Sequence, residues 1–365
     1  MATPPATRLI SCSLYWERTM LAKLRRRLLM AGRVLITGDS EHQVLREVPS
    51  ITPEEVAEAR AIFPLDKFFI LGHARSGTTL LARLVRLHPE VHCNYQAHFF
   101  TRPPLLQSLV ASKEVEAWLA RRSNRWNHGR DLSPLVLRAV ADFILEREAR
   151  PLGVRIVGDK SPNSLLGGEA VRLMHKVYPE ARLVYIVRDG RDTAISHRFQ
   201  AFIDAAQHLT NEDLRIRREF YADPGPFLRG ERSLFTPQGA RLAAESWTRN
   251  VCETERAAKE LYGDRFRTLR YEDLLSNPWE SLSQLWQFLG AGPGEPSLKE
   301  AVLAEAQRNP DSDWQQEKAG ELVGQLPKGQ PGLWRQLFTP FDCKVFREIA
   351  GPTLLAWKYE ANLDW

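Results

Sequence analysis

The sequence lacks the features that mark disulfide-rich secreted proteins and membrane proteins. It has only four cysteines, and they lie far apart, unlike the dense spacing of a small disulfide framework. It contains no run of eighteen uncharged apolar residues, so we expect no membrane-spanning helix. The first residues also lack the apolar core of a secretory signal. These absences predict a cytoplasmic protein.

Patterns typical of metal and nucleic-acid binding are missing as well. No cluster of His, Cys and carboxylate residues has the spacing of a metal site. The formal net charge of +5 suits an anionic partner, but there is no basic stripe interleaved with aromatic residues and no DNA-reading motif. We therefore expect neither a metal nor a nucleic-acid partner.

The domain organisation is inferred from the length of the chain and from its uniform composition. A chain of 365 residues can bury a large core, and no flexible linker divides it. We expect an N-terminal helical extension over residues 1–60 and a single α/β domain over residues 61–365. Residues Leu14–Val34 are amphipathic and basic, which favours a helix packed on the main domain; peripheral contact with a membrane or a partner is the alternative. The sequence does not specify an oligomeric state.

Short apolar runs alternate with helical patterns, which predicts an α/β fold. We expect a P-loop-like, doubly wound and mostly parallel sheet flanked by helices, with helical inserts. The expected strands are Phe68–Leu71, Val154–Val157, Leu183–Val187 and Phe266–Arg270. The expected helices include residues 240–262, a helix from Pro278 to Gly290, and a helix from Ser133 with an apolar face of Leu135, Val136, Ala139, Val140, Phe143 and Ile144.

The most informative segment reads FFILGHARSGTT and covers residues 68–79. The spacing of Gly72 and Gly77 is that of a Walker A phosphate loop, but Thr78 stands where that motif has its lysine. Arg75 supplies the cation from inside the loop instead. This substitution points away from ATP or GTP hydrolysis and toward another phosphate-containing donor.

The chemistry of this loop suits an anion. Glycine permits backbone angles that let successive N–H groups converge, and the start of the following helix favours a phosphate. The hydroxyl groups of Ser76, Thr78 and Thr79 add donors. The alternative is a Ser/Thr-rich helix start with incidental glycines.

A second segment joins a strand to a polar turn. The strand Leu183–Val187 runs into Arg188, and Ser196 lies eight residues later on a helix that we expect to begin near Asp192. Because the carboxyl ends of parallel strands meet at one edge of a sheet, Arg188 and Ser196 would face the first loop and bind a second phosphate. The alternative is a solvated turn in which Arg188 and Asp192 pair locally.

On these residues the chain resembles the sulfotransferases that use 3′-phosphoadenosine 5′-phosphosulfate (PAPS). That family binds the 5′-phosphosulfate with a loop of the form P-[KR]-S-G-T-[TS], which Ala74–Thr79 matches, and the 3′-phosphate with an Arg and a Ser eight residues on. A third family element resembles Pro327–Arg335, although Pro327 replaces an arginine. The resemblance implies PAPS as cosubstrate, adenosine 3′,5′-bisphosphate as product, and nucleotide contacts from Arg75, Ser76, Gly77, Thr78, Thr79, Arg188, Ser196, Tyr271, Lys328 and Gly329.

The subtype resembles the tyrosylprotein sulfotransferases and their bacterial relatives. Those proteins share R-S-G-T-T-L, then H-P-[DE]-V-x-C, and this chain has Arg75–Leu80 and His88–Cys93. Their K-D-P motif is similar to Gly158–Pro162, which follows the expected third strand. The resemblance implies that Lys160 stabilises charge at the transferring sulfonate; an ordinary loop lysine is the alternative.

The general base is the point at which the resemblance fails. The family's glutamate falls at Gln96, and a glutamine cannot take a proton near neutral pH. His98 lies two residues later and has a suitable unperturbed pKa, so we predict His98 as the base. The alternative is that His98 packs under the aromatic rings that follow it. His128 and Glu90 are weaker candidates.

These observations predict an enzyme that transfers a sulfonate from PAPS to a hydroxyl acceptor by in-line displacement, with residues 204–236 as an acceptor-side lid and residues 311–335 folding over the nucleotide. The acceptor is a small molecule, a sugar, a lipid or a protein tyrosine. Two alternatives remain. A P-loop kinase or NTPase would need a Mg²⁺ ligand, for which Asp159 is a candidate. A non-catalytic nucleotide-binding scaffold protein would explain Gln96.

Overall fold

The computed structural model describes residues 47–365, apart from residues 102–105, 164, 205–208 and 309–328. Residues Val48–Trp365 form one compact unit, and the account below concerns that unit alone. Most of the extension predicted for residues 1–60, including Leu14–Val34, lies outside the described residues. Among the described helices, none combines the length and the apolar character needed to cross a bilayer.

The centre of the unit is a five-stranded sheet in the order β2-β3-β1-β4-β5. Every adjacent pair of strands is parallel. The chain places β2 and β3 on one side of β1 and then crosses to the other side for β4 and β5, which is a doubly wound arrangement with its change of direction at β1. The predicted fold class is confirmed. The strands are β1 (Asp66–Leu71), β2 (Val91–Tyr95), β3 (Ile156–Lys160), β4 (Arg182–Val187) and β5 (Phe266–Arg270).

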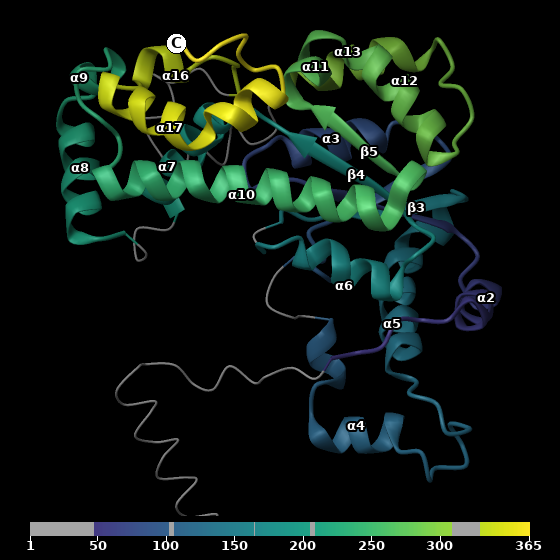
Figure 1. The fold of residues 1–365 in the computed structure, drawn as a ribbon. Helices are drawn as coiled ribbons and strands as arrows, with labels where there is room; N and C mark the ends of the chain where they lie inside the picture. Colours follow the sequence, from purple (N-terminus) through teal and green to yellow (C-terminus); the bar gives the residue numbers. More distant parts are fainter. Residues whose placement is uncertain (1–46, 102–105, 164, 205–208, 309–328) are drawn as a thin grey trace, which may run out of the picture. The chain divides into compact units, whose positions relative to one another are not determined.

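Helices connect the strands and cover both faces of the sheet (Figure 1). In Figure 1, α12 and α13 lie on one side of the sheet and α6 and α10 on the other. The helices are α2 (Pro53–Ile62), α3 (Thr78–Val85), α4 (Lys113–Ala120), α5 (Ser133–Ala149), α6 (Glu169–Val177), α7 (Gly190–Asp204), α8 (Asn211–Ala222), α9 (Gly225–Leu228), α10 (Pro237–Tyr262), α11 (Tyr271–Ser276), α12 (Pro278–Leu289), α13 (Leu298–Gln307), α16 (Trp334–Leu337) and α17 (Pro340–Ala356), with short 3-10 turns at Gln107–Val110, Arg150–Leu152 and Gly263–Arg265.

Successive strand residues point into two separate cores. In β1, Phe68 and Ile70 pack with α3 and α12, whereas Phe69 and Leu71 pack with α5, α6 and α10. Because side chains of a strand alternate between its faces, a sheet covered on both sides needs apolar residues at every position. This explains why the strands read as continuous apolar runs in the sequence.

Helix α5 buries a different face from the one predicted. Phe143 and Ile144 of the expected apolar face are 58% and 39% exposed. The buried face carries Leu137, Ala141 and Leu145 and, beside them, the charged residues Arg138, Asp142 and Glu146. The prediction was wrong because it assumed that only apolar residues mark the buried face of the helix, whereas this buried face also carries charged residues.

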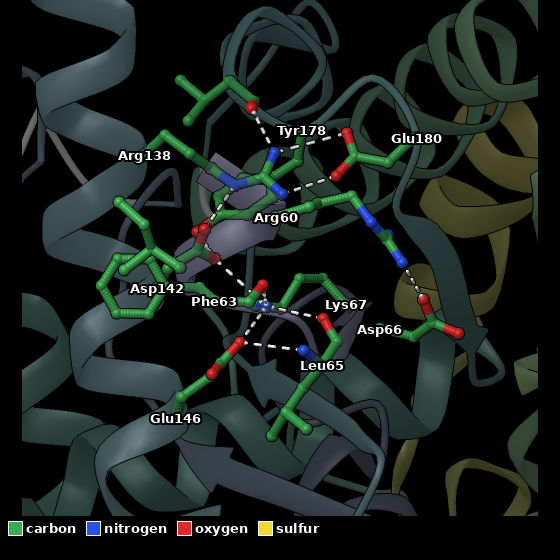
Figure 2. A network of polar contacts seen from close by, with 12 residues as sticks. Arg60, Phe63, Leu65, Asp66, Lys67, Arg138, Asp142, Glu146, Tyr178 and Glu180 are labelled. Atoms are coloured by element: carbon green, nitrogen blue, oxygen red, sulfur yellow. Dashed lines mark hydrogen bonds and ion pairs between the residues drawn. The ribbon is translucent and has the colours of Figure 1, made fainter. Parts of the chain in front are cut away.

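The buried charges of α5 are paired (Figure 2). Lys67 of β1 lies 2.7 Å from the Glu146 carboxylate and 3.4 Å from that of Asp142. Arg138 donates to Asp142 at 2.7 Å and to Glu180 at 2.6 Å. Burying charges is costly unless they are paired and hydrogen-bonded, so each of these ions depends on its partners.

Several element boundaries differ from the predicted ones; for example, β1 begins at Asp66 and β3 at Ile156 rather than at Phe68 and Val154. Strand β3 runs to Lys160, so Lys160 is the last strand residue and does not lie in a loop beyond the strand. Helix α7 begins at Gly190 rather than near Asp192. Helix α10 begins at Pro237, three residues before the predicted start, because Thr236 caps it by accepting a hydrogen bond from the backbone N–H of Gly239.

Candidate active site

The phosphate-loop segment leaves β1 at Leu71 and enters α3 at Thr78. Two of its residues have left-handed backbone conformations, Arg75 with φ 72° and Gly77 with φ 88°. A Cβ on Gly77 would lie 2.2 Å from the ring of Tyr271, so only glycine fits between the loop and this aromatic side chain. Glycine therefore serves here both to turn the chain and to allow the close approach of Tyr271.

Both predicted anion-binding segments meet at the carboxyl edge of the sheet. The Arg75 side chain donates from Nε to Ser196 Oγ at 3.2 Å, across 121 residues of sequence. Arg188 follows β4 directly, is buried, and places its guanidinium 4.9 Å from the centre of the Tyr271 ring. Arg188 also donates to the backbone oxygen of Gln330 at 3.4 Å. The predicted association of these segments is therefore present in the structure.

A hollow of about 450 Å³ lies between these segments. Ser76 is fully buried behind the loop, and Lys328 lies outside the described residues. Arg83 and Arg308, which the sequence analysis did not predict, add further cations to the wall. The predicted nucleotide-binding residues that line the hollow are Arg75, Gly77, Thr78, Thr79, Arg188, Ser196, Tyr271 and Gly329.

Asp192 fixes the third segment against the start of α7. Its carboxylate accepts from the backbone N–H of Gly332 at 2.6 Å and of Trp334 at 3.0 Å. Burial raises the pKa of Asp192, and these two backbone donors oppose that rise. Tyr271 holds the same segment by donating to the Gly329 oxygen at 3.0 Å. From the sequence, Asp192 was considered only as a local partner of Arg188, in the alternative to an anion site, and this role was not predicted. Its place in the first turn of a helix was the only signal.

Lys160 is buried at the end of β3 and donates from Nζ to Thr79 Oγ1 at 3.1 Å. Its ammonium group thus reaches the first turn of α3, next to the phosphate loop. Asp159 points elsewhere: its two oxygens accept from the backbone N–H of Ala97 at 3.0 Å and from Ser161 Oγ at 2.5 Å. Asp159 therefore holds the turn after β2, and burial raises its pKa.

The base candidates occupy very different places. Gln96 lines the hollow, whereas His98 is not among its lining residues. His98 is buried with φ 52°, and its Nδ1 lies 2.8 Å from Thr101 Oγ1. His128 lies exposed in the loop between α4 and α5.

Glu90 lies just before β2, at the edge of the sheet opposite to the phosphate loop. Arg155 binds both of its oxygens, at 2.8 and 2.9 Å, and lowers the pKa of Glu90 to about 2. A carboxylate with that pKa does not accept a proton near neutral pH. The position and the low pKa of Glu90 both argue against it as the base. The position of His128, in an exposed loop, argues against that residue.

Sequence similarity agrees with this geometry. Residues 67–224 match the sulfotransferase family. A protein-tyrosine sulfotransferase of Drosophila melanogaster is 25% identical over 224 residues, covering 60% of this chain and 37% of that protein. Protein-tyrosine sulfotransferase A of Caenorhabditis elegans is 30% identical over 133 residues, covering 35% of this chain and 32% of that protein. The part of the chain that contains both predicted anion-binding segments therefore matches the sulfotransferase family, and the relatives to which the chain is similar are protein-tyrosine sulfotransferases.

The extent of these matches is limited. The chain spans 37% and 32% of the lengths of those two relatives. Among solved structures, a mouse sulfotransferase complexed with PAP aligns with 85% of this chain and 94% of its own, with a TM-score of 0.43 and 17% identity.

Proposed function

We propose that this protein is a PAPS-dependent sulfotransferase that transfers a sulfonate group to a hydroxyl acceptor. The observation that carries the proposal is the meeting of Arg75 with Ser196, beside Arg188, around one hollow at the carboxyl edge of the sheet. Two separate anion-binding segments in one hollow suit a ligand with two anionic groups. A nucleotide that carries both a 5′-phosphosulfate and a 3′-phosphate has that chemistry.

A buried polar atom supports this assignment. Arg188 Nε has no hydrogen-bond partner among the described residues, although the atom is buried. Leaving a buried donor unsatisfied costs about 1–3 kcal/mol, so such atoms are normally paired. Arg188 lines the hollow, so an anionic oxygen bound there would satisfy this donor. The volume of about 450 Å³ also lies within the range of roughly 300–1,000 Å³ that small-molecule sites occupy.

Each residue has a distinct role in the proposal. The loop N–H groups of Gly77 and Thr78, at the start of α3, hold the 5′ anion together with Arg75, whereas the backbone N–H of Ser76 already donates to the His73 oxygen at 3.1 Å. Arg188 and Ser196 hold the 3′-phosphate. When bound, PAPS supplies a sulfonate joined to phosphate through an anhydride oxygen, on which negative charge develops as that bond breaks. Preorganised cations at this position stabilise the transition state more than the ground state.

In this proposal Lys160 serves that developing charge, although it is not among the residues that line the hollow. Its ammonium group is fixed by Thr79 at the first turn of α3 and by its own burial at the end of β3. It therefore needs little reorganisation during the reaction. His98 stays our sequence-based candidate for the base, and residues 311–335 stay our candidate for a cover over the nucleotide; of that segment, residues 329–335 are described and Gly329–Pro331 line the hollow.

The kinase alternative is not favoured. The loop has no lysine at Thr78, and both oxygens of Asp159 are engaged in holding the turn after β2. The scaffold alternative makes a different prediction, which is nucleotide binding without transfer.

The test is transfer of ³⁵S from labelled PAPS, without Mg²⁺, to a panel that contains a tyrosyl peptide, 2-naphthol, a sugar and a sterol. We expect transfer to at least one acceptor, and we expect Arg75→Ala and Lys160→Met to reduce it by at least 100-fold. Lys113→Met, in the exposed first turn of α4, is the control. Nucleotide binding with no transfer to any acceptor would favour the scaffold alternative. Near-wild-type turnover of His98→Ala would exclude His98 as the base.

A further inference from the structure

Two tryptophan side chains lie next to each other on the surface near the end of α4. Trp118 of α4 is 60% exposed, and Trp126, in the loop between α4 and α5, is 48% exposed. Their rings stack, with the ring centres 5.3 Å apart and an angle of 30° between the planes. The other tryptophans among the described residues are buried or half-buried, as is usual for this side chain. The fold therefore leaves one pair of large aromatic rings in contact with solvent.

The loop after α4 is held in place by two asparagines. The buried side chain of Asn127 donates from Nδ2 to the backbone oxygens of Leu119 at 3.1 Å and Arg121 at 3.3 Å. Asn124 donates from Nδ2 to the backbone oxygen of Trp118 at 2.9 Å. These bonds satisfy carbonyl groups at the C-terminal end of α4, where a helix leaves its last carbonyls without an internal partner. The tryptophan pair is therefore presented by a folded loop with a defined position relative to α4.

Arginines accompany the pair. Residues 117–130 contain four arginines and no aspartate or glutamate. Arg121, Arg122 and Arg125 are exposed, and none of them forms an ion pair with a described residue. The two acidic residues of α4 lie in its first turn, at the end of the helix opposite to the loop. The surface around the tryptophans is therefore positively charged.

This arrangement corrects the expectation that the chain has no basic segment interleaved with aromatic residues. The segment 118–126 has that composition, but it is short and spans a helix end and a loop, so it was not identified from the sequence. In Figure 1, α4 and the loop after it lie at the end of the unit remote from α11, α12 and α17. The segment is thus free to meet a large surface.

The geometry of the pair indicates the kind of surface. A nucleobase or a sugar ring that binds between two aromatic rings needs a gap between them, whereas these two rings already contact each other. Indole rings favour the boundary between water and lipid, where the apolar ring is buried among the headgroups. Arginine side chains at such a boundary bury their apolar stems and keep their charged ends in the polar layer. Anionic lipid headgroups attract those charges.

We infer that Trp118 and Trp126 insert into the headgroup layer of a membrane that contains anionic phospholipid, and that Arg121, Arg122 and Arg125 bind the lipid phosphates. Stable peripheral attachment needs two signals, and here apolar insertion and electrostatic attraction supply one each. The contact is separate from the candidate active site, so the inference does not depend on the proposed function.

Sedimentation of the full chain with lipid vesicles tests the attachment. The probes are vesicles of phosphatidylcholine alone and vesicles of phosphatidylcholine with phosphatidylglycerol. We expect at least tenfold stronger partition into the vesicles that contain phosphatidylglycerol, and a steep decrease of this partition as salt is added, because salt screens exposed charges. Equal partition into the two kinds of vesicle, or no partition into either, would overturn the inference.

The contribution of the tryptophans is tested with the double variant Trp118→Ala, Trp126→Ala. It should weaken partition into the anionic vesicles at least tenfold and leave the affinity for adenosine 3′,5′-bisphosphate within about threefold. The matched control is Ile62→Ala, Leu152→Ala, because these two apolar side chains are similarly exposed, at 63% and 61%. Wild-type partition of the tryptophan variant would contradict the assignment.

The arginines are tested by changing Arg121, Arg122 and Arg125 together to glutamine. Each basic residue near an anionic surface contributes about fivefold to binding, so this variant should lose at least tenfold in partition. The control changes Arg218, Arg241 and Arg256 to glutamine, which removes the same net charge from exposed positions of α8 and α10. Equal losses for the two triple variants would show that net charge alone attracts the protein, and would overturn the role of the α4 loop.

Fluorescence tests insertion itself, because bromine atoms on lipid chains quench indole fluorescence at short range. We expect brominated anionic vesicles to quench the wild type, and we expect Trp118→Phe, Trp126→Phe to lose most of this quenching while keeping partition within about fivefold. Unchanged quenching in that variant would show that other tryptophans meet the lipid. Binding to heparin or duplex DNA without binding to anionic vesicles would assign the surface to a different polyanion and contradict the inference.

Discussion

At the scale of single residues, the phosphate loop depends on backbone conformation as much as on charge. Gly77 has a left-handed backbone, and the Tyr271 ring occupies the space that a side chain would need. Gly153 has a similar backbone, with φ 70°, but a Cβ there would meet nothing within 4 Å. Comparing substitutions at these two glycines therefore separates the free-energy cost of the left-handed backbone from the cost of a clash with Tyr271.

We expect Gly153→Ala to cost about 1 kcal/mol of unfolding free energy, from the left-handed conformation alone. Gly77→Ala carries the same strain and must also displace Tyr271 from the loop. It should therefore be less stable than Gly153→Ala and should bind adenosine 3′,5′-bisphosphate at least tenfold more weakly. Urea unfolding and calorimetric titration measure the two effects. Equal unfolding free energies and equal nucleotide affinities of the two variants would show that the contact with Tyr271 affects neither stability nor binding.

Arg188 carries the second prediction at this scale. A hydrogen bond to a charged group is worth about 1.5–3 kcal/mol, so Arg188→Ala should weaken binding of the bisphosphate by about 10- to 150-fold. Arg256→Ala, at an exposed position of α10, should leave the affinity unchanged. The dissociation constants come from calorimetric titration. An affinity of Arg188→Ala within threefold of wild type would remove Arg188 from the 3′-phosphate site.

Residue patterns predicted the meeting of the two loop segments well and the packing on the other side of the phosphate loop poorly. The phosphate loop and the Arg188–Ser196 spacing are local in sequence, so their geometry follows from a strand, a turn and a helix start. His73, Ser246 and Thr193 come together only because α7 and α10 pack beside the loop. No local pattern encodes that packing, because it joins residues that are far apart in the sequence.

At the scale of elements, α5 shows why the apolar pattern misled. Its sequence places apolar residues on a face that the structure leaves partly exposed, because the opposite face carries the partners of Lys67. The apolar strands were easier to predict, since both of their faces are buried. When a helix has two moderately apolar faces, ion pairs with other elements decide which face is buried. Those ion pairs cannot be read from the sequence of the helix alone.

This network yields a stability prediction (Figure 2). Lys67→Met leaves the buried carboxylates of Asp142 and Glu146 without their shared cation, and breaking a buried ion pair typically costs about 3–5 kcal/mol. Adding Glu146→Gln should recover part of this loss by removing one buried charge. Arg60→Met breaks a partly exposed pair with Asp66 and should cost less than about 1 kcal/mol. Urea unfolding of the three variants is the measurement, and equal losses for Lys67→Met and Arg60→Met would contradict the account.

At the scale of the whole molecule, the C-terminal residues are joined to the candidate site. The hydroxyl group of Tyr359 lies 3.1 Å from the backbone oxygen of Val187, at the end of β4, and 3.0 Å from a carboxylate oxygen of Glu272. Glu272 in turn accepts from the backbone N–H of Asp189 at 3.1 Å. Arg191 lies between the rings of Trp334 and Trp365, at 3.7 and 4.3 Å from their centres. The turn that holds Arg188 is thus supported from the far end of the chain.

We expect Tyr359→Phe to cost about 1–3 kcal/mol of unfolding free energy, because it leaves buried acceptors without a donor. It should also weaken binding of the bisphosphate severalfold, through Arg188, although Tyr359 does not line the hollow. Tyr221→Phe, at an exposed position of α8, is the control and should change neither quantity. A destabilised Tyr359→Phe with wild-type nucleotide affinity would show that the C-terminal residues support the fold and not the site.

The central claim is that the hollow beside the phosphate loop recognises a nucleotide with both a 5′ anion and a 3′-phosphate. Calorimetric titration tests it most directly, by comparing adenosine 3′,5′-bisphosphate and adenosine 5′-phosphate, both without Mg²⁺, with Mg·ATP. We predict that the bisphosphate binds at least 100-fold more tightly than adenosine 5′-phosphate, and that Arg188→Ala removes most of this difference. Equal affinity for the two adenosine nucleotides, or tight binding of Mg·ATP alone, would contradict the account.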